Sequence, residues 1–208
     1  MLDRVRGRGG RPGNDGVELL DPLAAQASAT RQYGQEFREL LEILGPYGRQ
    51  NTFERASHLN RGEIPEEKPQ FLLYAAFIFY SDTPIHDLSN LHIMVCQNQP
   101  PKERGGITSA LTETMGAIQG GRNDIPDQFA IALTPDEEAR RLIPIILSRR
   151  QAVLGLTDGL MEEMARVAPG NEFLEDGLTY FRGRVVAFYN EFQDRAARMG
   201  IQTAGGGQ

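Results

Sequence analysis

Cysteine, lysine and histidine are scarce in this chain of 208 residues, and each shortage excludes something. The single cysteine, Cys96, rules out an intrachain disulfide and a metal cluster built on several thiolates. The two lysines are Lys68 and Lys102, so the remaining 20 of the 22 basic residues are arginines. Three histidines leave little material for a metal site, and we expect no metal or other cofactor.

Long apolar runs are also missing. The longest, Phe71 to Tyr80, would rise only about 15 Å as a helix, roughly half of a bilayer core, so we expect no membrane span. The first residues mix arginine and glycine and lack the apolar stretch of a secretory signal. We therefore expect no signal peptide, and a location in the cytoplasm or within an assembled particle.

Familiar catalytic motifs are absent as well. The chain contains no Glu-x-x-His pair, no zinc-protease motif, no nucleophile elbow and no phosphate-binding loop. Glu54 and His58 stand four residues apart, a spacing for a metal or for acid–base work, but a surface ion pair explains them better. His86 is the other candidate base, and Cys96 is expected to be a buried, inert thiol. We therefore do not expect an enzyme.

The sequence combines a positively charged N-terminal segment with a negatively charged remainder, which we call the body. Within the first 17 residues, Arg4, Arg6, Arg8 and Arg11 outweigh two aspartates by +2, which leaves −8 for the remainder of a chain whose net charge is −6. Glycines around these arginines disfavour a helix, so residues 1–17 are predicted to be a flexible arm. Its partner would be phosphate of a nucleic acid or the acidic body of a neighbouring copy, and both remain open.

Caps, prolines and glycines divide the body into helices. They predict helices at 22–44, from Asn51 to about Gly62, at 69–83, at 84–98, one ending at Gly120, one at 135–167 that Pro144 bends or breaks, and one from Asn171 to Gly200. Loops are predicted at 99–106 and at 122–133. In the second loop Phe129, Ile131 and Leu133 alternate with alanine, the only strand-like pattern in the chain.

The last helix carries the most regular apolar pattern. Leu178, Phe181, Val185, Phe188 and Phe192 recur at steps of three and four and should form one packing seam, against the core or a second subunit. Arg195 interrupts this pattern. Either the helix end already lies outside the core or Arg195 pairs with a neighbouring carboxylate, and we favour the first interpretation.

Together these signals predict an all-α protein, an irregular bundle of about seven or eight helices. One helical domain would span 18–200, in which any seam between two halves would fall within 99–134, and a flexible tail would follow at 201–208. The predicted function is that of a structural or interaction protein, a subunit of a homo-oligomeric assembly such as a virion, filament or phage-type particle. Two alternatives stay open: a small helical enzyme using His58 and Glu54 or His86, and a helical nucleic-acid-binding regulator.

Overall fold

A computed structural model describes residues 51–98 and 101–201 of the chain, with the side chains of 94–103 left outside that description. The predicted arm, the helix predicted at 22–44 and residues 202–208 lie outside the described residues. Within the described ranges every regular element is helical and there is no strand. The predicted all-α class is therefore confirmed, whereas the predicted seven or eight helices exceed the five long ones that build the structure.

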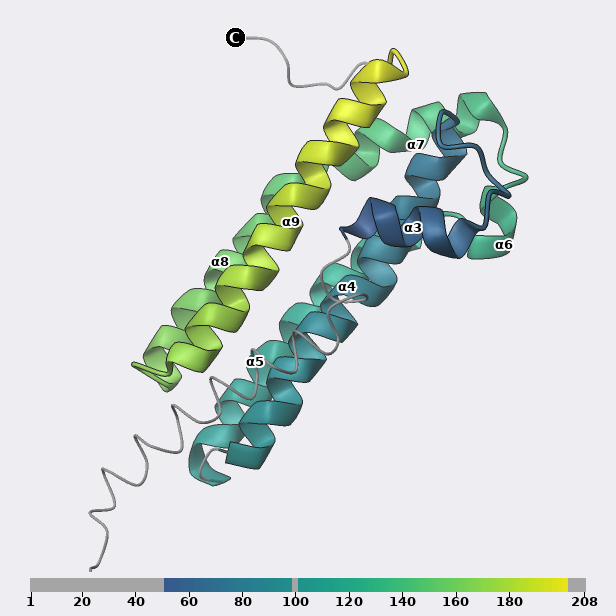
Figure 1. The fold of residues 1–208 in the computed structure, drawn as a ribbon. Coiled ribbons are helices and arrows are strands. Elements are labelled where there is room, and N and C mark those ends of the chain that lie inside the picture. The colour runs from purple at the N-terminus through teal and green to yellow at the C-terminus, as the bar shows by residue number, and fades with distance from the viewer. Residues whose placement is uncertain (1–50, 99–100, 202–208) are drawn as a thin grey trace, which may run out of the picture.

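Four of the long helices form an antiparallel bundle (Figure 1). Contacts run from α4 to α5, from α5 to α8, from α8 to α9 and from α9 back to α4, so the ring of neighbours closes. The chain runs alternately down and up along this ring, the arrangement of an up-down-up-down bundle. The bounds are α4 Pro69–Asn98, α5 Pro101–Gln119, α8 Arg150–Val167 and α9 Glu172–Arg198.

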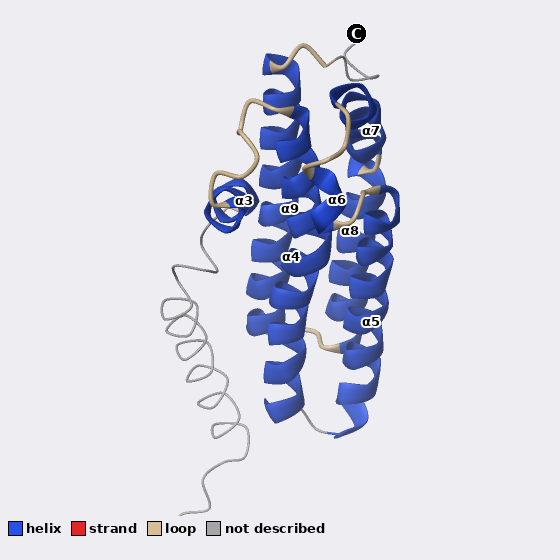
Figure 2. Cartoon of the chain, turned by 90° about the vertical axis from the view of Figure 1, so that its right-hand side faces the viewer, coloured by secondary structure: helices blue, strands red, loops and turns tan. Residues whose placement is uncertain are grey.

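The remaining elements gather at one end of the bundle (Figure 2). They are α3 Thr52–Asn60, the 3-10 helix η1 Gly120–Asp124, the short α6 Gln128–Ile131 and the fifth long helix, α7 Asp136–Ser148. The start of α3 is the capping box predicted from the sequence: the Asn51 side chain accepts a hydrogen bond from the backbone N–H of Glu54, and the Glu54 side chain accepts one from the Asn51 N–H. Asn171 caps α9 as predicted.

The apolar pattern of α9 lies inside the core. Leu178, Phe181, Val185, Phe188 and Phe192 are all buried, with Phe188 stacked on Phe79 at 3.9 Å between ring centroids. The seam therefore packs against its own chain, and its pattern gives no argument for a partner helix. Core residues from both sides of 99–134 join one apolar cluster, so that stretch separates no two cores. Ile201, predicted to open the tail, is buried too.

Pro84 was wrongly predicted to end one helix and begin another, and Pro144 was predicted to bend or break the helix at 135–167. Pro84 lies inside α4, which continues from Pro69 to Asn98 instead of dividing into helices at 69–83 and 84–98. Buried side chains on both sides of this proline, from Phe79 and Tyr80 to Leu88, pack into the core and hold the two halves in line. Pro144 likewise lies inside α7, and the break before α8 comes at Arg149.

Two predicted loops are largely helical. Residues 101–106, predicted as loop, form the first turns of α5, because a proline such as Pro101 is well suited to the first position of a helix. The strand-like alternation around Ile131 is a short helix. The start of α7 also differs in detail: Thr134 does not cap it, since its hydroxyl donates to the Ala130 carbonyl at 3.0 Å.

Candidate interaction surface

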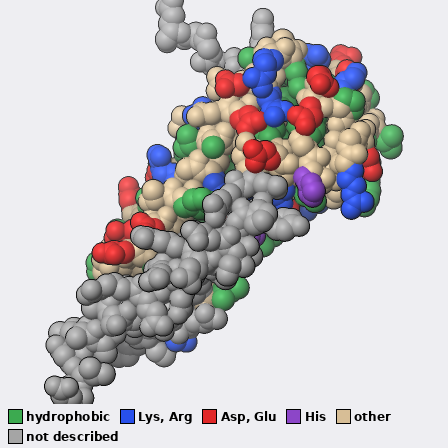
Figure 3. All heavy atoms as spheres, viewed as in Figure 1, with side chains coloured by type: hydrophobic (Ala, Val, Ile, Leu, Met, Phe, Trp, Pro, Cys, Tyr) green, Lys and Arg blue, Asp and Glu red, His purple; other side chains and the backbone are tan. Residues whose placement is uncertain are grey.

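Two large apolar side chains project from the end of the molecule that carries α6. Phe129 is 89% exposed and Leu133 is 84% exposed, far more than any other large apolar side chain among the described residues. We call these two residues the α6 pair. Phe129 lies within α6, and Leu133 lies in the turn that directly follows it. Hydrophobic side chains protrude at this edge of the molecule in Figure 3, among interspersed acidic and basic groups.

The α6 pair stands on a firmly attached support. Ile131, between its two members, is completely buried. The Gln70 side chain on α4 donates to the Thr134 carbonyl at 2.7 Å and to a carboxylate oxygen of Asp136 at 2.8 Å, which fixes the turn that follows α6. The exposure of the α6 pair is therefore a property of a positioned element and not of a loose loop.

This segment was predicted to be a loop with a strand-like alternation, and it contains a short helix instead. In a helix, residues two apart point about 200° from each other, which explains why Ile131 is buried while Phe129 is exposed. Leu133, in the turn after α6, is exposed as well. The alternating signal was thus the one sequence feature that could have identified the α6 pair.

A cavity of about 300 Å³ lies where the beginning of α3 meets α9. Phe53 and Phe188 are buried beside it, with their rings stacked at 5.7 Å between centroids. Gly183 and Ala187 leave the α9 side of the cavity open, since a Cβ on Gly183 would meet nothing within 4 Å. We call this space the α3/α9 cavity; its other lining residues are Asn51, Thr52, Tyr180, Arg184 and Glu191.

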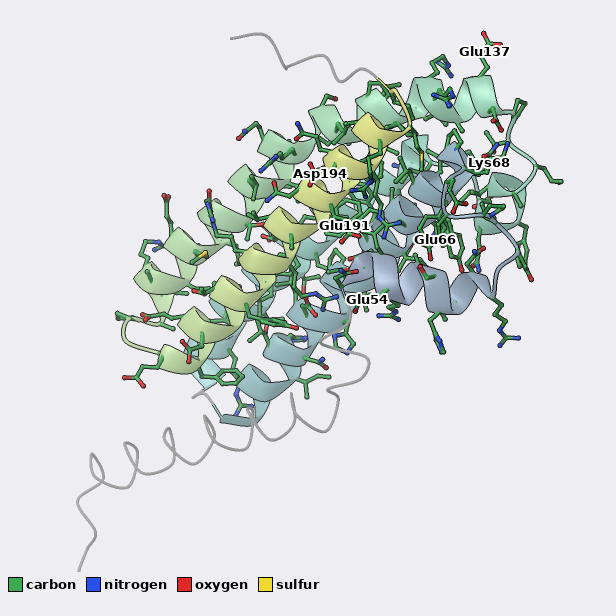
Figure 4. The ribbon with its side chains drawn as sticks, turned by 45° about the horizontal axis from the view of Figure 1, so that its top comes forward. Glu54, Glu66, Lys68, Glu137, Glu191 and Asp194 are labelled. Carbon is green, nitrogen blue, oxygen red and sulfur yellow. The ribbon has the colours of Figure 1, made fainter. Side chains whose placement is uncertain are left out.

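Polar groups stand at the rim of the α3/α9 cavity. The Asn51 side-chain amide donates to Glu191 at 3.1 Å and ties α3 to α9. Figure 4 shows Glu54 and Glu191 on the side of the molecule where α3 lies beside α9. Arg184 lines the same cavity, and its guanidinium lies 5.9 Å from the centre of the Tyr180 ring. The cavity thus combines aromatic side chains with a cation and a carboxylate.

Arg184 is held by a buried ion pair. Its Nη1 donates to Asp87 Oδ1 on α4 at 2.7 Å, and the two side chains are only 12% and 6% exposed. His86 Nδ1 lies 3.0 Å from the same oxygen. The second carboxylate oxygen, Asp87 Oδ2, is buried and has no hydrogen-bond partner among the described residues. Neither His86 nor Asp87 lines the α3/α9 cavity, so a substrate in that cavity would not reach these two side chains.

A second, larger cavity of about 680 Å³ lies between α4 and η1. Its lining is mostly polar, and its charged groups are already paired: Asp82 with Arg55 at 2.9 Å, and Asp127 with Arg122 at 3.3 Å. The Arg122 guanidinium also lies 4.6 Å from the centre of the Phe77 ring. An apolar side chain that entered this cavity would displace water from these ion pairs and offer no hydrogen bond in return, which costs free energy.

Behind this cavity two tyrosines share a buried hydrogen bond. The hydroxyl oxygens of Tyr80 and Tyr189 are 2.6 Å apart, and both side chains are fully buried. Burial raises the pKa of both phenols above the ordinary tyrosine value, so both stay neutral. Arg149 ties η1 to the start of α8 by bonding the Gly121 carbonyl and pairing with Asp124. These contacts fix the wall of the cavity.

The interpretation favoured for Arg195 was wrong. Its guanidinium pairs with Glu66 at 3.1 Å and with Glu191 at 2.9 Å, and it lies 4.7 Å from the centre of the Phe53 ring. The end of α9 therefore remains part of the packed structure, and Arg195 fastens the segment between α3 and α4 to it. A hydrogen bond from Ser57, together with Arg195, lowers the pKa of the Glu66 carboxyl.

The structure does not unite the other predicted site residues. Arg4, Arg6, Arg8 and Arg11 lie outside the described residues, as does the side chain of Cys96. Glu54 and His58 form no ion pair with each other, since the Glu54 carboxylate is engaged in the capping box. Among the described residues no group of three or more histidine, cysteine, aspartate or glutamate side chains is placed to hold a metal ion. None of the described helices is both long and apolar enough to cross a membrane.

Comparison with known proteins gives no relative. No family model matches the chain, no curated protein matches it, and no solved structure matches it. The arrangement of the surfaces described above is therefore the basis for a functional proposal.

Proposed function

We propose that this chain is a structural or interaction protein that associates with further copies of itself. The observation that supports this proposal is the α6 pair, because Phe129 and Leu133 are held almost fully exposed by an element that is itself anchored in the core. Single exposed apolar side chains are common on proteins, but two of them on one short, positioned helix and its following turn suit the centre of an interface. The class of assembly that we propose is a virion, filament or phage-type particle.

The described surface supports a protein partner better than a nucleic acid. Arginines there are largely paired with carboxylates of the same chain, as Arg141 is with Glu138 at 2.7 Å and Arg182 with Asp158 at 2.6 Å. A nucleic-acid interface requires a patch of positive charge that is free to meet phosphate. Any contact with nucleic acid would therefore rest on Arg4, Arg6, Arg8 and Arg11 of the arm.

The experiment is a measurement of mass in solution across a range of protein concentrations. We expect the mass of the wild-type chain to rise above the 23.1 kDa of one copy, and Phe129→Ser with Leu133→Ser to restore the monomer. Ile93→Ser is the matched control, since Ile93 is also an exposed apolar residue, on α4. A wild-type chain that stays monomeric throughout, or one whose association survives the double substitution, would refute the proposal.

A further inference from the structure

We infer that the α6 pair of one copy inserts into the α3/α9 cavity of the next copy, so that copies join head to tail. This inference rests on the proposed self-association and names the second surface that the α6 pair requires. Both surfaces belong to the described part of the chain. The α6 pair projects from the surface, with Phe129 and Leu133 exposed, whereas the α3/α9 cavity is a recess with a volume of about 300 Å³.

The two surfaces match in chemistry. The stacked rings of Phe53 and Phe188 form the buried base of the cavity, so an apolar side chain that enters it meets an aromatic wall. Gly183 and Ala187 leave room above that base, and Gly183 carries no side chain that would have to move. The larger cavity at η1 is a poorer receptor for the α6 pair, because most of its lining is polar, whereas most of the exposed lining of the α3/α9 cavity is apolar.

Charge at the two rims also matches. Asp127 precedes α6; its Oδ1 pairs with Arg122 at 3.3 Å, but the side chain is 84% exposed, so the carboxylate can meet a second cation beside the α6 pair. Arg184 at the cavity makes one hydrogen bond within the described residues, from Nη1 to Asp87, whereas a guanidinium has five N–H donors. We therefore expect Asp127 of one copy to face Arg184 of the next.

Shape favours a head-to-tail contact over a symmetric one. If the α6 pairs of two copies met, two projections would oppose each other and no recess would receive either side chain, whereas strong interface anchors fill pockets. Nor can the α6 pair fill the cavity of its own chain, because α6 lies well apart from the junction of α3 with α9 (Figures 1 and 2). A contact between two different surfaces leaves one of each unused at the ends, so it extends into a ring or a filament.

The experiment is a complementation test on the full chain with two variants. The double substitution Phe129→Ser with Leu133→Ser removes the projection and keeps the cavity, whereas Ala187→Glu fills the cavity and keeps the projection. All three residues are exposed, so each variant is expected to fold, which circular dichroism and thermal unfolding will verify. Ala197→Glu, at another exposed alanine of α9, is the matched control for the added carboxylate.

We expect each variant alone to lose about tenfold or more in association affinity, as substitutions at an interface anchor do. An equimolar mixture should then form a two-chain species that grows no further, twice the 23.1 kDa of one copy, because one intact projection still meets one intact cavity. The Ala197→Glu control should associate like the wild type.

Other outcomes overturn the inference in distinguishable ways. If Ala187→Glu associates like the wild type and the mixture gives no two-chain species, the α3/α9 cavity does not receive the α6 pair. That result would be expected if the α6 pairs of two copies met each other, or if residues 1–50 of the same chain occupied the cavity. The proposed self-association would then stand without this inference. If the wild-type chain is monomeric at every concentration, both the inference and the proposed function fail together.

Discussion

Replacing Gly177 by alanine tests how closely α9 approaches α4, the contact that sets the position of Arg184 and of the α3/α9 cavity. An added Cβ would lie 3.2 Å from Leu91 Cγ and 3.3 Å from its Cδ1, and closer still to Cδ2. Leu91 is only 2% exposed, so its side chain cannot swing into solvent to make room. Overpacking of this kind costs about 1–3 kcal/mol. Alanine itself favours a helix over glycine by about 1 kcal/mol, which offsets part of that cost.

Gly159 on α8 gives the matched control, because a Cβ there would meet nothing within 4 Å. Gly159→Ala should therefore raise the free energy of unfolding by about 1 kcal/mol. The free energy of unfolding of Gly177→Ala should be about 1–3 kcal/mol lower than that of Gly159→Ala. Chemical denaturation followed by circular dichroism measures both. Equal stabilisation by the two alanines would show that α4 and α9 are not in close contact at Leu91, and the reasoning would be refuted.

Three further predictions concern the packing and the ion pairs. Phe188→Ala should lower the free energy of unfolding by about 3–5 kcal/mol, since this ring is 3% exposed, and a loss below about 1 kcal/mol in denaturation would contradict its burial. Tyr80→Phe or Tyr189→Phe should each lower the free energy of unfolding by about 0.5–1.5 kcal/mol, because each removes the hydrogen bond between the two buried hydroxyls, and the double variant should cost less than their sum in a denaturation cycle; additive costs would argue against the shared bond. The pKa of Glu66 is lowered in the folded state by the Ser57 hydrogen bond, so its contribution to stability is present at neutral pH and is lost as the pH falls from 4.5 through the folded value. Glu66→Gln should remove that part of the pH dependence in thermal unfolding, and identical pH profiles of the two proteins would contradict it.

The parts of the fold that were predictable are those that local signals determine. The Asn51 capping box, the Asn171 cap and the buried pattern of α9 each depend on residues within one or two turns. Pro84 shows the limit of such signals. Its missing N–H weakens the helix locally, but α4 continues because the side chains before and after it are buried against α5, α7 and α9. Only the tertiary arrangement contains that information.

The candidate surfaces were less predictable than the fold. The α3/α9 cavity joins residues more than a hundred positions apart, such as Phe53 and Phe188, and no local pattern relates them. Arg195 was misjudged partly for the same reason: two of its partners, Glu66 and Phe53, are distant in sequence, although Glu191 is only four residues away. The α6 pair did leave a signal, the alternation around Ile131, but its meaning depends on whether the segment is a strand or a helix.

Photo-cross-linking from position 129 tests the head-to-tail contact most directly. The chain would carry p-benzoylphenylalanine in place of Phe129, and copies with and without ¹⁵N would be mixed so that mass spectrometry separates links between chains from links within one. We predict links between chains, from position 129 to the stretch of α9 between Tyr180 and Phe188 that lines the α3/α9 cavity. Links from position 129 to α6 of another copy, links only within one chain, or no product at concentrations where the mass exceeds that of the monomer would contradict the account.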